Sequence, residues 1–417
     1  MVDTDTKKSS RTPWLWIPTL YFAEGIPYVI VMTVAGIMYK RMEISNTDIA
    51  LYTSWLYLPW VIKPLWSPFV DVLKTKRFWI VTIQLILGAL LGGVALVLPM
   101  PHFFQYTILL FWLIAFNSAT QDIAIDGFYM LGLSQEHQAF FIGIRNTFYR
   151  LAMVSGQGLL IMLAGFFEQR YSLQIAWSMV FTITAVLFMI FSFYHKYLLP
   201  FPEEEKKNNS VHFQDFWKAI QTFFQKKNIL VILAFLLFYR FAESQLIKIA
   251  SPFLLDKRNL GGLELSTTQV GFVYGTVGII ALVCGGLLGG ILASRKGLRY
   301  WLWVMVCAIN LPNIVYVYLS FFQPDNFWSI NICVFVEQFG YGFGFTAYTL
   351  YMLHISAGEH ETAHYALCTG LMALGMMLPG MFSGWIQEML GYKMFFVWIM
   401  FATIPSFFVT RLVWKKI

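Results

Sequence analysis

The segment from Arg77 to Pro99 reads RFWIVTIQLILGALLGGVALVLP and carries no acidic or basic side chain after its first residue. An α-helix needs roughly 20 mostly apolar residues to cross a bilayer, because all its backbone polar groups must be satisfied within the segment. This segment meets that requirement. It therefore predicts a membrane-spanning helix, and similar stretches recur along the chain.

The composition of the whole chain also indicates a membrane protein. Of its 417 residues, 58% are hydrophobic and only 12% are charged, about half the charged fraction of a soluble chain. Too few charged side chains remain to cover a water-exposed surface of this size, so a water-soluble globule is excluded. Twelve stretches qualify as spans: 14–39, 47–70, 77–99, 104–132, 138–166, 173–195, 228–254, 268–293, 298–321, 327–354, 361–388 and 393–414.

The positions of lysine and arginine predict the orientation of these helices. If the N-terminus is cytoplasmic, eighteen of the 29 basic residues lie in the inside segments and six in the outside connections. This bias follows the positive-inside rule, so both termini are predicted to be cytoplasmic. The net charge of +7 then reflects membrane anchoring, and no nucleic-acid partner is expected.

The longest polar stretch, 196–227, separates six predicted helices from six. Its second part, Val211 to Gln225, places aromatic residues at helical spacing against polar ones, which is typical of a helix lying on a membrane surface. The predicted parts are therefore an N-terminal six-helix bundle at 1–195, a cytoplasmic linker with an amphipathic helix at 196–227, and a C-terminal six-helix bundle at 228–417.

The two halves resemble each other at a nearly constant offset. Phe22-Ala23-Glu24 recurs as Phe241-Ala242-Glu243, and Ser45-Asn46-Thr47 recurs as Ser266-Thr267-Thr268. Parallel six-helix repeats are the architecture of the major facilitator superfamily, whose substrates bind near the bilayer midplane at the repeat interface. The repeat therefore predicts a secondary transporter with its substrate site between the halves.

Ionisable side chains inside a span cost roughly 2.5 kcal/mol or more each and mark functional positions. Asp122 and Asp126 lie one turn apart on one helix face, where two carboxylates raise each other's proton affinity. Together with Glu24, they are the predicted proton-coupling residues. The alternative is that Asp122 forms a fixed ion pair with Arg150, and Asp126 with Arg145.

Other polar side chains of the spans are predicted to line the transport path. Arg240 and Lys248 form a basic stripe that suits an anionic substrate, unless Glu243 or Glu337 neutralises Arg240 for packing alone. The candidate substrate-binding residues are Tyr28, Gln121, Asn146, Tyr149, Arg150, Arg240, Glu243, Lys248, Glu337 and Tyr341.

The cytoplasmic end of the second span combines an acid with bases, a pattern that could clamp and release neighbouring helix ends. The candidate gating residues are Lys63, Asp71 and Arg77, with simple positive-inside anchoring as the alternative. No nucleophile elbow, Gly-rich phosphate loop or His/Cys/Asp metal cluster occurs. Neither an enzyme, a metal nor a cofactor is expected, and a proton gradient would supply the energy.

Four motifs resemble the AmpG-like muropeptide permease family of the major facilitator superfamily. They are YFAEGIP at 21–27, KPLWSPFVD at 63–71, QDIAID at 121–126 and YRL at 149–151. The resemblance implies twelve core helices and proton-driven import of anhydro-muropeptides across the bacterial inner membrane by a monomer.

Two departures from the family pattern leave the solute open. Glu24 stands where small polar residues are common, and Val72 replaces a base that usually follows the acid. The partner is expected to be a small solute, a muropeptide or a related anionic amino sugar. The alternatives are a proton-coupled carrier of a sugar or an acetyl-CoA-like metabolite, or a drug or metabolite antiporter.

Overall fold

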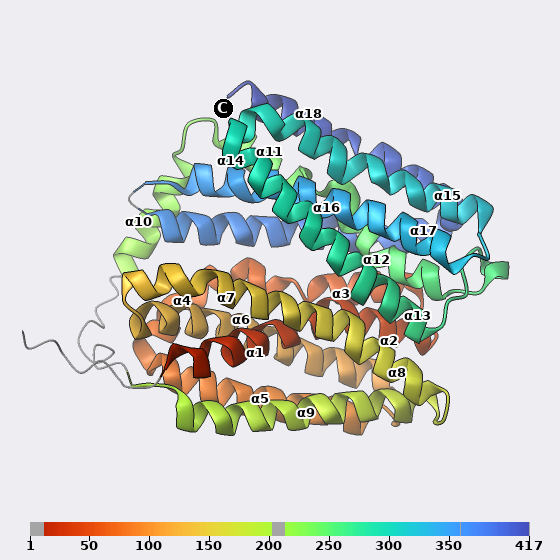
Figure 1. Cartoon of the computed structure of the whole chain (residues 1–417), viewed down its shortest axis with the longest axis horizontal. Coiled ribbons are helices and arrows are strands. Elements are labelled where there is room, and N and C mark those ends of the chain that lie inside the picture. Colours follow the sequence, from red (N-terminus) through yellow and green to blue (C-terminus); the bar gives the residue numbers. More distant parts are fainter. Residues whose placement is uncertain (1–11, 202–212, 359, 417) are drawn as a thin grey trace, which may run out of the picture. The chain divides into compact units, whose positions relative to one another are not determined.

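The computed structural model describes residues 12–201, 213–358 and 360–416. Every regular element in these ranges is a helix, which confirms the predicted all-α class (Figure 1). The first nine α-helices are α1 (Ile17–Val29), α2 (Ala35–Arg41), α3 (Asn46–Trp55), α4 (Leu58–Leu73), α5 (Lys76–Val97), α6 (Phe103–Gly132), α7 (Gln135–Val154), α8 (Ile161–Glu168) and α9 (Leu173–Leu198). The remaining nine are α10 (Phe213–Phe224), α11 (Ile229–Phe238), α12 (Phe241–Leu255), α13 (Thr267–Phe272), α14 (Ile279–Asn310), α15 (Ile314–Phe322), α16 (Phe327–Ser356), α17 (Glu361–Ala402) and α18 (Ile404–Trp414).

Eight stretches of the described residues are long and apolar enough to cross a membrane. Two of them, Thr267–Phe322 and Glu361–Trp414, each contain a glycine with positive φ, Gly297 at 77° and Gly391 at 70°. Glycine adopts this conformation without the strain that a Cβ would add. The chain therefore turns at these glycines, and each stretch holds more than one straight helix.

Several of the predicted spans are interrupted by π-helical turns. These turns cover Ile30–Val34, Ser155–Leu160 and Val273–Gly278. A π-turn widens the helix locally and is often found at functional sites. Apolar length alone predicts a span but does not reveal such a turn.

The repeated Ser-x-Thr segments have a physical basis in the structure. Ser45 caps α3 by accepting a hydrogen bond from the backbone of Asp48, and Ser266 caps α13 by accepting one from Gln269. A side-chain oxygen at this position satisfies a backbone N–H that has no partner within the helix. The repeated segment thus marks the start of a corresponding helix in each half, α3 and α13.

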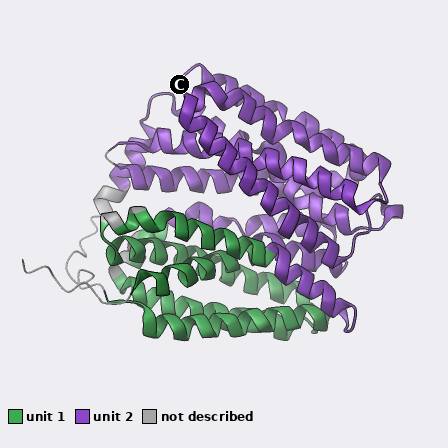
Figure 2. Ribbon diagram, in the orientation of Figure 1, with its two compact units in different colours: residues 1–31, 65–156, 174–213 green, residues 32–64, 157–173, 214–417 purple. Residues whose placement is uncertain are grey.

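The chain divides into two compact units (Figure 2). Unit 1 comprises residues 1–31, 65–156 and 174–213, and unit 2 comprises 32–64, 157–173 and 214–417. Unit 1 contains α1, α5, α6, α7 and α9, whereas unit 2 joins α2, α3 and α8 to all the helices from α11 onward. The predicted division at 196–227 follows the sequence repeat and stays a prediction.

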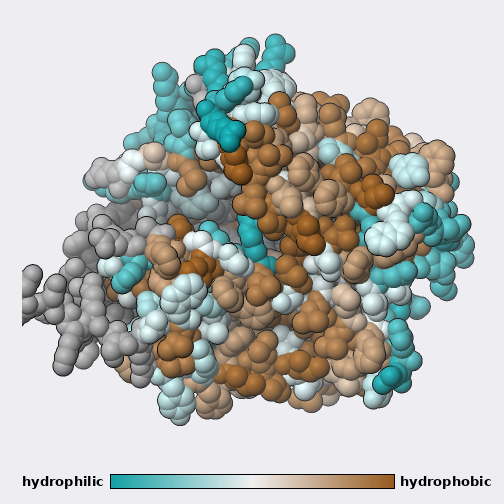
Figure 3. Space-filling model, viewed as in Figure 1, coloured by the Kyte–Doolittle hydropathy of each residue, from teal (hydrophilic) through white to brown (hydrophobic). Residues whose placement is uncertain are grey.

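Large apolar side chains are exposed along many of the described helices, as the brown areas of Figure 3 show. Leu96, Leu230 and Phe322 each expose more than 70% of their surface. Exposed apolar surface of this extent marks contact with a membrane or another protein rather than with water. The spans would place these side chains in lipid.

Candidate substrate and proton sites

Lys248 is a buried cation in unit 2. Its side chain is 7% exposed, its Nζ donates a hydrogen bond of 2.9 Å to Thr53 Oγ1, and it lies 5.1 Å from the ring centre of Tyr57. No carboxylate lies within ion-pair distance of Lys248 among the described residues. When Lys248 is protonated, its charge therefore has no counter-charge among the described residues.

Small and polar groups surround Lys248. A Cβ built on Gly380 would lie 3.6 Å from Lys248 Cγ and 2.9 Å from Ser54 Oγ, so all three residues meet where α17 passes α12 and α3. The Ser54 hydroxyl is buried and forms no hydrogen bond among the described residues. A buried hydroxyl without a partner is costly, and a ligand could satisfy it.

Arg240 and Glu243 form a buried ion pair at the start of α12, about two turns before Lys248. Arg240 Nε and Nη2 donate to the two carboxylate oxygens of Glu243 at 2.9 and 2.8 Å, and Nη2 also donates to Tyr341 Oη at 2.9 Å. The guanidinium lies 4.9 Å from the ring centre of Phe345. This bidentate geometry is the strong form of a charge-assisted pair, so the charge of Arg240 is balanced within unit 2.

Glu337 is a buried carboxyl surrounded by neutral groups. It is 5% exposed on α16, and its Oε2 accepts hydrogen bonds from Gln338 Nε2 at 2.9 Å and Tyr316 Oη at 3.5 Å. The Tyr316 hydroxyl lies 2.6 Å from that of Tyr274. The three side chains form a chain of exchangeable protons that joins α16, α15 and the π-turn Val273–Gly278.

In unit 1, the carboxylate of Asp126 pairs with Arg145. The distance from Arg145 Nη2 to Asp126 Oδ1 is 3.2 Å, and the guanidinium also lies over the rings of Tyr21 and Tyr129. The Asp126 side chain is 44% exposed. Asp122 is half-buried one turn earlier on α6. The structure thus contains the Asp126–Arg145 ion pair, which the sequence predicted as the alternative to a proton-coupling role for Asp126.

The other predicted residues of unit 1 lie on α1, α6 and α7. Gln121 is buried and its Nε2 donates to the backbone oxygen of Ala23 at 3.4 Å. The remaining positions differ in exposure: Glu24 is buried, Tyr28 and Tyr149 are half-buried, and Asn146 and Arg150 are exposed. The three helices thus bring all the predicted proton and substrate residues of the first half into one unit.

The predicted gating residues do not all lie in one unit. Lys63 is half-buried in the part of α4 that belongs to unit 2, whereas Asp71 and Arg77 belong to unit 1. The side chain of Asp71 lies outside the described part of the chain. Arg77 Nη2 donates to the backbone oxygen of Lys196, and its guanidinium lies 3.9 Å from the ring centre of Phe201.

Sequence reasoning missed a polar network in unit 2. Lys40 pairs with Asp256 at 2.7 Å and donates to Asn46 Oδ1 at 2.9 Å, while Asn46 Nδ2 donates to Gln387 Oε1 at 2.6 Å. Tyr392 donates to Asp256 and accepts from Asn46. Asn46 lies in one of the repeated segments, which was the available signal. The network joins α2 and α3 to α12 and α17.

A second contact at this end of unit 2 joins α8 to α13. Arg41 donates to both carboxylate oxygens of Glu168, and Thr267 Oγ1 donates to the same carboxylate at 2.6 Å. A Cβ built on Gly275 would lie 1.9 Å from the Cα of Gly158. Only glycine permits this approach, so the two π-turns are in direct backbone contact.

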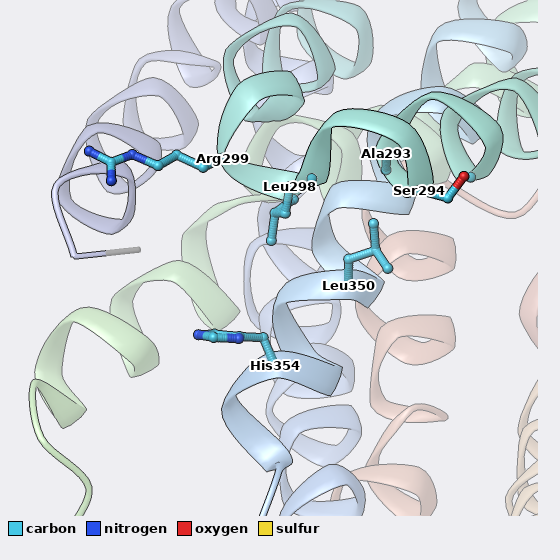
Figure 4. Close-up of a pocket in the computed structure, with 8 residues that line it drawn as sticks. Ala293, Ser294, Leu298, Arg299, Leu350 and His354 are labelled. Atoms are coloured by element: carbon cyan, nitrogen blue, oxygen red, sulfur yellow. The ribbon is translucent and has the colours of Figure 1, made fainter.

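A cavity of about 470 Å³ lies beside the turn of α14 at Gly297 (Figure 4). Its lining includes Ser294 and Arg299 of α14 and Leu350 and His354 of α16. None of the predicted site residues lines this cavity. Lys248 and Glu337 are therefore parts of a different region of unit 2.

Comparisons with known proteins identify the kind of protein to which these sites belong. Residues 19–378 match the family model described as Major Facilitator Superfamily. An anhydromuropeptide permease from Escherichia coli is 25% identical over 93% of this chain and 77% of its own length. A protein with the name AmpG 4 from Rickettsia conorii is 24% identical over 94% of both chains.

A solved structure supports the same fold. A bacterial homologue of the human lysosomal transporter Spinster aligns with a TM-score of 0.70 and 16% identity, over 95% of this chain and 96% of its own. The comparisons confirm the predicted resemblance to AmpG-like permeases and the prediction of a permease rather than an enzyme.

Proposed function

The chain belongs to the Major Facilitator Superfamily, and we propose that it is a proton-coupled importer of an anionic amino sugar, with anhydro-muropeptides as the first candidates. It is a multi-pass membrane transporter of a small solute. The bacterial inner membrane, a monomeric state and alternating access are parts of the proposal. The name of the Escherichia coli relative supports muropeptides as the first solutes to test.

The single observation that carries the proposed substrate class is the buried amine of Lys248, which has no carboxylate partner among the described residues. Protonation of this amine costs several kcal/mol of lost hydration, which the contacts with Thr53 and Tyr57 repay only in part. A solute carboxylate beside Nζ would restore the balance, and the unsatisfied Ser54 hydroxyl could bond to it. A muramic acid carries such a carboxylate on its lactyl group, whereas a neutral sugar carries none.

The proposed topology has twelve spans in two six-helix bundles, 1–195 and 228–417, with 196–227 as a cytoplasmic linker and both termini in the cytoplasm. The turns at Gly297 and Gly391 support part of this count, because each separates two helices within one long apolar stretch and so raises the eight apolar stretches to ten. The charge bias of the connections supports the orientation.

Asp122 is the first candidate for proton coupling in the N-terminal half. Asp126 lies one turn later, where it pairs with Arg145, and two carboxylates at this spacing raise each other's proton affinity. Glu24 is buried on α1 and is the third candidate. The remaining proposed substrate ligands are Tyr28, Gln121, Asn146, Tyr149, Arg150, Arg240, Glu243 and Tyr341, and the proposed gating residues are Lys63, Asp71 and Arg77.

Uptake into proteoliposomes tests the proposal. The purified protein is supplied with labelled anhydro-muropeptide, N-acetylmuramic acid, a neutral disaccharide and acetyl-CoA, each with and without an imposed pH gradient. We expect gradient-driven accumulation of the carboxylate-bearing amino sugars and none of the neutral disaccharide. Accumulation of the neutral sugar alone, or export of aromatic cations, would favour the sugar carrier or the drug antiporter.

Asp122→Asn tests the proton role of this residue. We expect the variant to lose gradient-driven accumulation, because the amide cannot release a proton. The control is Asp325→Asn, which removes the charge of a side chain that is 95% exposed. Full accumulation by Asp122→Asn would exclude Asp122 from coupling.

A further inference from the structure

We infer that Glu337 is a proton-carrying group of the transport cycle and that the hydroxyls of Tyr316 and Tyr274 are the path by which its proton leaves. This inference rests on the proposed proton coupling and adds a carboxyl of the C-terminal half to it. It also gives Glu337 a role different from the substrate contact that its position in the sequence predicts.

The charge balance around Glu337 favours a neutral carboxyl. Among the described residues, the titratable groups that face it are Tyr316 on α15, Tyr274 on the π-turn and Glu243 on α12. Glu243 is itself negative and already holds Arg240. No basic side chain lies within ion-pair distance of Glu337 in the described ranges. An ionised carboxylate here would be buried without a counter-charge, which the bilayer makes costly.

Glu337 differs in this respect from the other buried acid of the region. Glu243 faces a guanidinium through two hydrogen bonds and is therefore stable as a carboxylate. Glu337 accepts only from an amide and a phenol, which bond to a protonated carboxyl as well as to a charged one. These two acids on neighbouring helices thus have opposite preferences, and of the two it is Glu337 that is suited to binding and releasing a proton.

The path for the proton follows from the hydroxyl chain. A phenolic hydroxyl both donates and accepts, so it can pass a proton on while receiving another. The O–H bond of Glu337 breaks as its proton passes to Tyr316 Oη, the proton of Tyr316 passes to Tyr274 Oη, and Tyr274 gives its own proton to water. The net result is a Glu337 carboxylate and one hydronium ion, with both tyrosines restored.

The position of Tyr274 connects this path to a contact that can open. Tyr274 lies in the π-turn Val273–Gly278, next to Gly275, whose backbone touches Gly158. Tyr274 is half-buried, whereas Glu337 is buried. Separation of these two turns would increase the access of water to Tyr274 and favour release.

Glu337→Gln is the decisive variant, because glutamine keeps the shape and the polar contacts but carries no titratable proton. Two assays are run on it in proteoliposomes. The first is exchange of labelled for unlabelled solute at equal concentrations, which requires no proton flux. The second is accumulation driven by an imposed gradient of about one pH unit, which supports about tenfold accumulation per coupled proton.

We expect Glu337→Gln to keep exchange and to lose the accumulation. Tyr316→Phe, which removes one hydroxyl of the path, should slow accumulation while exchange persists. Glu361→Gln is the control, because it removes an exposed carboxylate from the start of α17. Infrared difference spectroscopy of the purified protein gives an independent readout: the carbonyl band of a protonated carboxyl should be present in the wild type and absent from Glu337→Gln.

The outcomes separate this inference from the proposed function. Wild-type accumulation that is indifferent to the pH gradient would overturn the proposed coupling itself. Wild-type accumulation that responds to the gradient, together with normal accumulation by Glu337→Gln or an unchanged carbonyl band, would overturn the role of Glu337 alone. Loss of exchange as well as accumulation in Glu337→Gln would assign Glu337 to solute binding and would also overturn the inference.

Discussion

Lys248→Met should change stability and solute binding in opposite directions. Methionine has a similar length and fills the same space without a charge. The substitution removes one hydrogen bond, worth about 1.5–3 kcal/mol when the amine is charged, and also the desolvation cost of that charge, which is several kcal/mol. Thr53 still donates to the backbone oxygen of Ile49 at 2.7 Å, so no buried hydroxyl loses its only partner. We therefore expect the free energy of unfolding to stay equal or to rise by about 1 kcal/mol or more.

Binding of the anionic solute should weaken in the same variant. A hydrogen bond between a charged donor and a carboxylate contributes about 1.5–3 kcal/mol. Since each 1.4 kcal/mol is a factor of ten, the loss corresponds to about a 10- to 100-fold higher Kd. A neutral analogue of the solute should bind to both proteins with similar affinity.

Two measurements on the purified protein check this prediction. Thermal unfolding without solute reports stability, and calorimetric titration with the carboxylate-bearing solute reports Kd. Lys393→Met is the matched control, because it removes the same charge from an exposed position on α17. A variant that unfolds at a clearly lower temperature and yet binds the anion normally would refute the reasoning, since Lys248 would then serve the packing of the unit alone.

Two further substitutions test the balance of charge and the close contacts of unit 2. Glu243→Gln leaves Arg240 buried without a counter-charge, so we expect a loss of about 3–5 kcal/mol in the free energy of unfolding, measured by thermal denaturation. Adding Arg240→Met to this variant should recover most of the lost stability. A double variant that recovers none of it would contradict the explanation. Gly275→Ala should separate the two π-turns, because its Cβ would lie 1.9 Å from the Cα of Gly158. We expect faster amide hydrogen exchange in α8 and α13, whereas Gly290→Ala, which meets no atom within 4 Å, should leave exchange unchanged.

The helices were predictable because their signal is local. A span needs only length and apolarity, and the caps at Ser45 and Ser266 need only a side-chain oxygen before the first turn. The pairing of Arg240 with Glu243 was also open to prediction as an alternative, since residues three apart share a helix face.

The partners of Lys248 and Glu337 could not be predicted in this way. Thr53 lies 195 positions from Lys248, and Tyr274 and Tyr316 come from elements other than that of Glu337. Helical periodicity states which residues share a face but not which face of another helix it meets. Most of the predicted carboxylates and bases lie within helices, although Arg240 lies at the break between α11 and α12. The neutral side chains that set their charge state could not be assigned from the sequence.

The bonds from Asn46 to Gln387 and Tyr392 join positions 341 and 346 residues apart. Membrane proteins are synthesised from the N-terminus at about 5–20 residues per second, so Asn46 exists for many seconds before Gln387 and Tyr392 are made. During that interval, Lys40 and Asn46 must be kept apart from lipid by water, the insertion machinery or a temporary neighbour. A chain that stalls before α17 would carry these polar groups unsatisfied, which would give cellular quality control a means of recognising incomplete copies.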